Sequence, residues 1–99
     1  GLDDGEIPTS EFHVSRQLHS SVVLDVRDKN ERDAFNIGGQ HIPLHLLSEH
    51  LTLLDKNKSI FCYCQTGIRS KQAAVLLEKN GFTVKSLKGG LASFLKDYR

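Results

Sequence analysis

The sequence predicts a single α/β domain built on a parallel β-sheet. Short apolar runs alternate along the chain with segments of helical pattern, and turn-forming glycine, asparagine and proline residues separate them. Strands that alternate with helices form βαβ units, in which the strands run parallel. Because 99 residues suffice for one hydrophobic core and no internal repeat is present, we expect residues 1–99 to form one domain.

The strands are predicted from runs of β-branched and aromatic residues. The strongest runs, residues 22–26 and 60–64, are almost continuously apolar, as in strands buried on both faces. Thr83–Leu87 is a weaker candidate. Ile7 and Ile42 mark two very short strands, each of which runs into a proline that limits pairing.

The helices are predicted from apolar periodicity and from residues that begin or end helices. The segments with this pattern are residues 11–18, 29–35, 44–54, 70–80 and 91–98. We expect Thr9 and Ser10 to cap the first of them. In that helix Phe12, Val14 and Leu18 are expected to face the core.

Charge and cysteine content exclude several classes of protein. Thirteen Lys and Arg against twelve Asp and Glu give a formal charge of +1, which argues against a nucleic-acid surface built on bulk charge. The longest apolar run, residues 60–64, is too short to cross a bilayer, so no membrane association is expected. One residue separates Cys62 from Cys64, and a disulfide between cysteines so close on a strand would be strained. We therefore expect two free thiols and a reducing, cytoplasmic compartment. The chain lacks methionine and begins with glycine, which suggests a piece of a longer protein.

The segment 64–70 joins the strongest predicted strand to the strongest predicted helix. Cys64 ends the strand, so its sulfur should face the crevice at the carboxyl edge of the sheet. Gly67 permits a tight turn, and the helix that begins near Ser70 directs unpaired N–H groups and its positive dipole end to the same place. Arg69 adds a permanent positive charge. A thiolate is stabilised in such surroundings, and we expect Cys64 to be a nucleophile in an anion-binding loop.

The substrate is expected to contact the backbone of this loop. Its N–H groups would form a cradle for an anionic group carried on the sulfur. The residues expected to bind substrate are Gln65, Thr66, Gly67, Ile68 and Ser70.

Asp25 and Arg27 follow the other strong strand and have a supporting role in this interpretation. Asp25 comes after three apolar residues and, once buried, needs hydrogen-bond partners. We expect it to accept hydrogen bonds from loop N–H groups or from an arginine and to brace the active loop. Arg27 is expected to form a structural ion pair with Glu31.

These residues together resemble the rhodanese-like sulfurtransferase domains. The family's active loop reads Cys-x-x-Gly-x-Arg-Ser and opens a helix, as segment 64–70 does here. Three further family motifs match along most of the chain. They are Asp25-Val26-Arg27 followed by Glu31, His41-Ile42-Pro43, and Leu87-Lys88-Gly89-Gly90. The stretch from Gly38 to Leu44 departs from the common family pattern and resembles the C-terminal rhodanese domain of E1-like molybdopterin and thiamine-type adenylyltransferases.

The resemblance implies a fold, a reaction and partners. The fold would be a rhodanese-like, five-stranded, mainly parallel sheet flanked by helices on both faces. Sulfane sulfur would pass to Cys64 as a persulfide and then to a nucleophilic acceptor, with Arg69 as the second catalytic residue. The donor would be thiosulfate, a sulfur-carrier protein or a cysteine desulfurase, and no metal or organic cofactor is implied. Because Arg69 is the main charge of the loop, we expect modest activity with the thiosulfate dianion and better activity with a protein persulfide.

Other interpretations of the same residues remain open. Cysteine phosphatases and arsenate reductases have five residues between cysteine and arginine, whereas four separate Cys64 from Arg69 here. A rhodanese fold can also serve as a non-catalytic docking or regulatory module. Cys62 is interpreted as a packed core thiol, with a resolving cysteine as the alternative. No histidine spacing predicts a metal site, and the oligomeric state cannot be deduced from the sequence.

Overall fold

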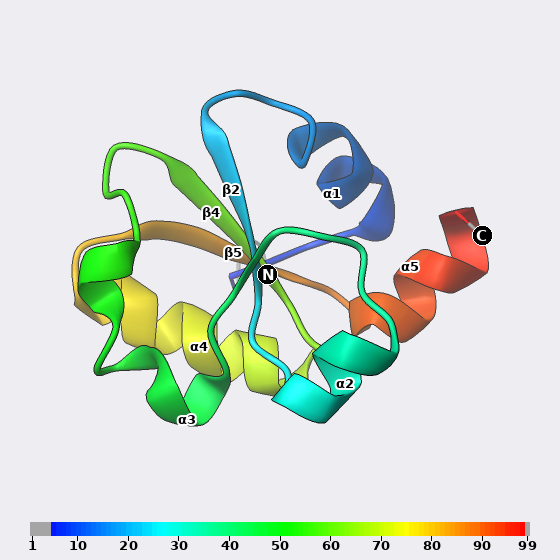
Figure 1. The fold of residues 1–99 in the computed structure, drawn as a ribbon. Helices are drawn as coiled ribbons and strands as arrows, with labels where there is room; N and C mark the ends of the chain where they lie inside the picture. The colour runs from blue at the N-terminus through cyan, green and yellow to red at the C-terminus, as the bar shows by residue number, and fades with distance from the viewer. Residues whose placement is uncertain (1–4, 99) are drawn as a thin grey trace.

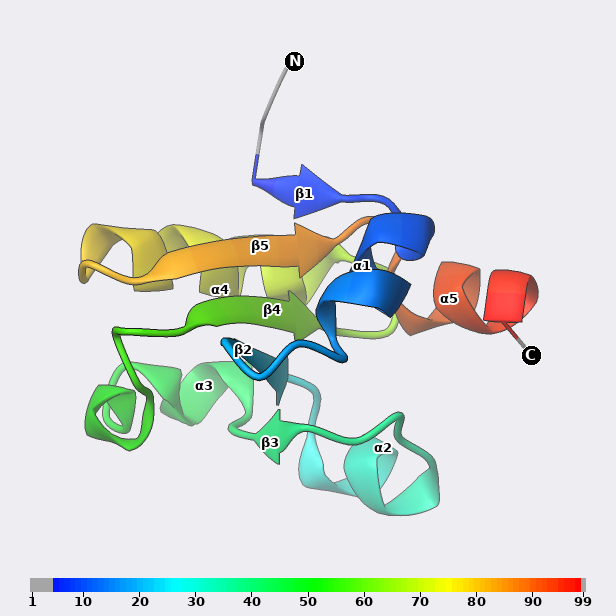
Figure 2. The same cartoon turned by 90° about the horizontal axis from the view of Figure 1, so that it is seen from above.

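A five-stranded parallel sheet forms the centre of the structure, a computed structural model that describes residues 5–98. The strands are β1 (Glu6–Ile7), β2 (Ser21–Asp25), β3 (Gln40–His41), β4 (Ser59–Tyr63) and β5 (Thr83–Leu87). Their order across the sheet is β1-β5-β4-β2-β3, and every neighbouring pair is parallel. The strands therefore end at one common edge, which Figure 2 shows facing α5 and α2.

Helices connect the strands and cover both faces of the sheet, as expected. They are α1 (Thr9–Ser15), α2 (Lys29–Ala34), α3 (Leu44–Leu47), α4 (Ile68–Lys79) and α5 (Gly90–Tyr98), with a short 3₁₀ helix at Leu51–Leu53. Figure 1 shows α3 and α4 on one side of the sheet and α1 on the other. Among residues 5–98, no helix combines the length and the apolar character that crossing a membrane requires.

The core is divided between the two faces of the sheet. On one face, α3 and α4 pack against a cluster that includes Leu24, Ile60 and Cys62. On the other, α1 and α5 pack against a cluster that includes Tyr63 and Leu87. The alternation along β4 produces this division, because successive side chains of a strand point to opposite faces. Cys64 belongs to the α3–α4 cluster, so its side chain continues the alternation one residue beyond the strand.

The first helix is shorter than predicted and buries fewer residues. It begins after Pro8 with no side-chain cap and ends at Ser15. Phe12 is fully buried, but Val14 and Leu18 are 62% and 53% exposed, so their predicted inward orientation is wrong. On a helix only positions three or four apart share a face, so Val14 cannot accompany Phe12. Leu18 lies beyond the end of the helix.

Two other segments differ from the sequence prediction. The leucine-rich stretch 44–54 forms a single turn of α-helix and then a 3₁₀ helix instead of one continuous element. Helix α4 begins at Ile68, two residues before the predicted start. The early start follows from Gly67, whose positive φ of 99° reverses the chain tightly after β4. As a result, the first turn of α4 lies directly beside Cys64.

Candidate active site

The candidate site is a loop at the carboxyl end of β4, the central strand. Cys64 follows the last residue of β4 and is fully buried, and α4 begins four residues later. The start of α5 holds the loop in place: Leu91 N–H donates to the Cys64 carbonyl at 2.8 Å, and Ala92 N–H donates to the Gln65 carbonyl at 3.0 Å. The end of β4 and the start of α5, which are remote in the sequence, therefore shape the loop together.

Two glycines permit this close approach. A Cβ atom on Gly90 would lie 2.6 Å from the Gln65 carbonyl, inside the contact distance that real atoms allow. A Cβ atom on Gly67 would lie 3.2 Å from the backbone nitrogen of Gly89, and the positive φ of Gly67 is strained for any other residue. Gly67 and Gly90 thus allow the start of α5 to pack against the active loop.

The sulfur of Cys64 lies at the meeting point of hydrogen-bond donors. The N–H of Gly67 donates to Cys64 Sγ at 3.1 Å, and the N–H of Ser70 donates to it at 3.3 Å. The hydroxyl of Ser70 is 3.5 Å from the same atom. Donors directed at sulfur favour its charged form. The backbone of the loop can therefore stabilise negative charge on the sulfur.

The predicted substrate-binding residues take different positions around this sulfur. Gly67 and Ser70 are buried and supply the N–H groups just described. Gln65 is half-buried, whereas Thr66 is exposed and Ile68 has 68% of its surface exposed. The outer rim of the loop thus presents uncharged side chains to solvent.

A layer of buried polar groups lies beneath the loop. The hydroxyls of Ser70 and Ser86 are 2.6 Å apart, and the Cys62 thiol donates to the Ser70 carbonyl at 3.3 Å. Burial, reinforced by the nearby charge of Cys64, raises the pKa of Cys62 to about 12, so this thiol stays protonated. Ser86 was not predicted from the sequence as a site residue. Its only signal is a small hydroxyl residue in a predicted strand, β5, which lies next to β4 in the sheet.

Arg69 forms a two-point ion pair with Glu31 of α2. Its Nη1 and Nη2 lie 2.6 and 2.9 Å from the two carboxylate oxygens of Glu31, and Asp28 lies 4.0 Å away. The hydrogen bonds from Arg69 lower the pKa of Glu31 to about 2, and those to Glu31 raise the pKa of Arg69. The positive charge expected for the cradle is therefore compensated by a neighbouring carboxylate. The pair also fixes the first turn of α4 to α2.

Asp25 is the acceptor of a buried network at the end of β2. Arg27 donates to it through its backbone N–H, Nε and Nη2 at 3.0–3.1 Å, so an arginine is a partner as expected. The predicted pairing of Arg27 with Glu31 is wrong, because Glu31 turns to Arg69. Burial opposes ionisation of Asp25, but the hydrogen bonds from Arg27 outweigh it and lower the pKa of Asp25.

Tyr63 and Arg32 extend this network and were not identified from the sequence. The Tyr63 hydroxyl lies 3.1 Å from Asp25 and 3.0 Å from the Gly38 carbonyl, and Arg32 donates to the Gly38 and Gly39 carbonyls. Tyr63 directly precedes Cys64. The network therefore joins the end of β4, from which the active loop departs, to the segment between α2 and β3.

Comparison with known proteins gives one consistent result. A sequence model of the rhodanese-like domain matches residues 11–97. Among curated proteins, the chain is 31% identical over 86 residues to a tRNA sulfurtransferase of Sodalis glossinidius, covering 81% of this chain and 18% of that protein. It is 37% identical over 78 residues to the probable adenylyltransferase/sulfurtransferase MoeZ of Mycobacterium tuberculosis, covering 75% of this chain and 20% of that protein. The chain thus spans about a fifth of the length of these two relatives.

The fold comparison agrees with the sequence comparison. A crystal structure of a rhodanese-related protein from Thermoplasma volcanium superposes with a TM-score of 0.82 at 25% identity, covering 94% of this chain and 92% of that one. The match to MoeZ, which is named as an adenylyltransferase and sulfurtransferase, is consistent with the resemblance to the rhodanese domain of E1-like enzymes.

Proposed function

Since the chain belongs to the rhodanese-like domain family, we propose that it is a sulfurtransferase that carries sulfane sulfur as a persulfide on Cys64. The observation that carries the proposal is the pair of backbone N–H groups at 3.1 and 3.3 Å from Cys64 Sγ. Negative charge on sulfur appears in both states of such a reaction, as the thiolate before loading and as the terminal persulfide sulfur after it. A cradle of preorganised N–H donors favours both states.

The proposed reaction has two displacement steps at sulfur. The Cys64 thiolate attacks the sulfane sulfur of a donor, so that a new S–S bond forms while the donor's bond to that sulfur breaks and the donor leaves with the electron pair. An acceptor thiolate then attacks the terminal sulfur of the Cys64 persulfide. The bond between the two sulfurs breaks, Cys64 leaves as a thiolate, and the free protein is regenerated without an external oxidant or reductant.

The charge distribution supports a protein persulfide as a better donor than thiosulfate. Thiosulfate carries two negative charges, and Arg69, the cation of the loop, is already paired with Glu31. The exposed rim residues Thr66 and Ile68 are uncharged, and Ile68 offers apolar surface to an approaching protein. A sulfur-carrier protein or a cysteine desulfurase is therefore the proposed partner. Both cysteines are free thiols in the structure, in keeping with a reducing compartment such as the cytoplasm.

The test is intact mass spectrometry before and after incubation with a sulfur donor. Thiosulfate and a cysteine-desulfurase persulfide are used separately, on the wild type, on Cys64→Ser and on Cys62→Ser as the matched control. We expect the wild type and Cys62→Ser to gain the mass of one sulfur atom, which cyanide or a thiol then removes, and Cys64→Ser to gain nothing.

Two outcomes would contradict the proposal. Failure of a folded wild-type protein to accept sulfur from either donor would favour a docking module over an enzyme. Loading of Cys64 by thiosulfate at a rate equal to that with the protein persulfide would leave sulfur transfer intact but overturn the donor preference.

A further inference from the structure

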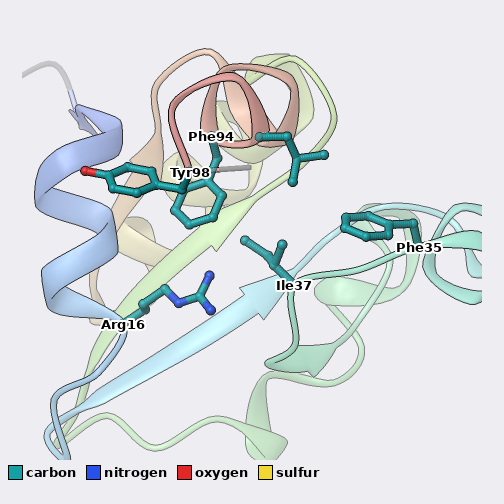
Figure 3. Close-up of a pocket in the computed structure, with 6 residues that line it drawn as sticks. Arg16, Phe35, Ile37, Phe94 and Tyr98 are labelled. Atoms are coloured by element: carbon teal, nitrogen blue, oxygen red, sulfur yellow. The ribbon is translucent and has the colours of Figure 1, made fainter.

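An apolar groove lies between α5 and the segment that connects α2 to β3, apart from the sulfur cradle. Its volume is about 610 Å³, and three separate parts of the chain line it. Figure 3 shows Phe35 and Ile37 on one side, Phe94 and Tyr98 on the α5 side, and Arg16 reaching between them. Phe35 is 50% exposed and belongs to neither core cluster, so its ring is free to contact a ligand.

Arg16 gives this groove a charged end, for which residues 5–98 provide no ion pair. Its guanidinium lies over the Phe94 ring, 5.1 Å from the ring centre. The Nη1 atom is shielded from solvent, yet it has no hydrogen-bond partner within the part of the chain that the structure describes. Arg27, Arg32 and Arg69 behave differently, because each faces a carboxylate within 4.0 Å.

A second unpaired nitrogen belongs to His13, which contacts Tyr98 of the groove but does not itself line the groove. The His13 ring is stacked on Tyr98 with 4.1 Å between ring centres, and its Nδ1 is buried without a hydrogen-bond partner in residues 5–98. Buried polar atoms are nearly always paired in folded proteins. The unpaired Nη1 of Arg16, a residue of the groove lining, therefore indicates that a polar group belongs there.

We propose that this groove binds a small amphipathic organic anion, with an apolar chain or ring and one carboxylate or sulfonate group. The volume falls in the range of small-molecule pockets, about 300–1,000 Å³. The apolar part would lie against Phe35 and Ile37, and the anionic group would accept hydrogen bonds from Arg16. A guanidinium is always charged and presents planar donors that match a carboxylate, so it selects an anion over an alcohol or an amine. Neither the cradle nor Cys64 takes part in this binding.

The test compares three ligands with the same alkyl chain on the wild-type protein. Amide shifts in a ¹H–¹⁵N NMR titration are followed with decanoate, decanol and decylamine, below their critical micelle concentrations. We expect decanoate to shift the signals of Ile37, Leu95 and Tyr98 and to bind about tenfold more tightly than decanol, the factor that one charge-assisted hydrogen bond provides. Decylamine should bind more weakly than decanol.

Single substitutions test which residue binds the anionic group and which binds the apolar chain. Arg16→Gln should weaken decanoate about tenfold, because the guanidinium that binds the carboxylate is lost, and should affect decanol far less, because Phe35 and Ile37 remain. Lys56→Gln is the matched control: Lys56 lies 5.3 Å from the Phe82 ring centre in a different surface groove, and its removal should change nothing. Phe35→Ser should weaken decanoate and decanol alike.

The inference is overturned if decanoate leaves these signals unshifted, if decanol binds as tightly as decanoate, or if Arg16→Gln binds decanoate like the wild type. The ligand comparison on the wild type decides the question even where a variant does not fold. Cys64→Ser should bind decanoate normally, so failure of sulfur transfer and failure of this site are separate results.

Discussion

Glu31→Gln tests two roles of Arg69: the ion pair that ties α4 to α2, and the positive charge that we expect at the sulfur cradle once this pair is broken. The change keeps the shape of the side chain and removes its negative charge. The lowered pKa of Glu31, from 4.5 to about 2, corresponds to about 3 kcal/mol of interaction with the ionised form. Because the Glu31 and Arg69 side chains are 31% and 33% exposed, solvent screening reduces this to about 1–2 kcal/mol.

This contribution has a defined pH dependence. The pKa of Glu31 is lower in the folded protein than in the unfolded chain, so the stabilisation is fully present above about 4.5 and is lost as the pH falls towards 2. Urea unfolding should therefore show a difference of about 1–2 kcal/mol between wild type and Glu31→Gln at pH 7, and a difference that shrinks below pH 4.5.

Glu31→Gln should lose stability but gain activity with thiosulfate as the donor. Arg69 without its partner leaves positive charge available to thiosulfate, and about 1 kcal/mol of added attraction raises kcat/KM for thiosulfate about fivefold. The rate with a protein persulfide should change less. Asp33→Asn is the matched control, because it removes an exposed carboxylate of α2 that pairs with Lys29 and lies outside the cradle.

An unchanged free energy of unfolding at pH 7 would refute the reasoning on the ion pair. A gain in thiosulfate turnover by Asp33→Asn equal to that of Glu31→Gln would show that net charge, and not release of Arg69, is responsible.

Three further predictions follow from the loop and its supports. Gly90→Ala should destabilise the protein by about 2 kcal/mol and slow sulfur loading of Cys64, because the added Cβ would collide with the active loop. Thermal unfolding measures the stability and mass spectrometry the loading rate. A variant with the stability and loading rate of the wild type would contradict the prediction. Iodoacetamide at pH 8 should leave Cys62 unmodified in the folded protein, since burial raises its pKa to about 12; a labelled Cys62 in a peptide map would show the opposite. Asp25→Ala should lower both activity and the free energy of unfolding, the latter by about 3 kcal/mol, because Arg27, which is 2% exposed, is left buried without its counter-ion. Urea unfolding measures the loss of stability. An inactive variant of wild-type stability would instead indicate a direct catalytic role of Asp25.

The loop could be predicted because its determinants are local in the sequence. A strand end, Gly67 and a helix start within seven residues place backbone N–H groups near Cys64. The alternation of strands and helices likewise sufficed for the α/β fold, because it depends on patterns within each segment.

Contacts between distant segments could not be predicted from the sequence. The contacts of Ser70 with Ser86 and of Tyr63 with Asp25 depend on which strands are neighbours and on their register, which no local pattern encodes. The expected pair of Arg27 with Glu31 does not form, because Glu31 pairs with Arg69 of α4, which is 38 residues away in the sequence. Helix α2 begins only at Lys29, so Arg27 lies outside it and turns back to the strand end.

The docking of α5 also determines which sign of charge the loop can accept. A trans peptide group holds its carbonyl oxygen and its N–H on opposite sides. Because the carbonyls of Cys64 and Gln65 are both bound by N–H groups of α5, the N–H groups of Gln65 and Thr66 must turn the other way. Free carbonyl oxygens in the loop could otherwise rotate inward and repel an anionic sulfur. The last helix thus favours an anion at Cys64 by direct contact, because its N–H groups hold the negative ends of these two peptide dipoles.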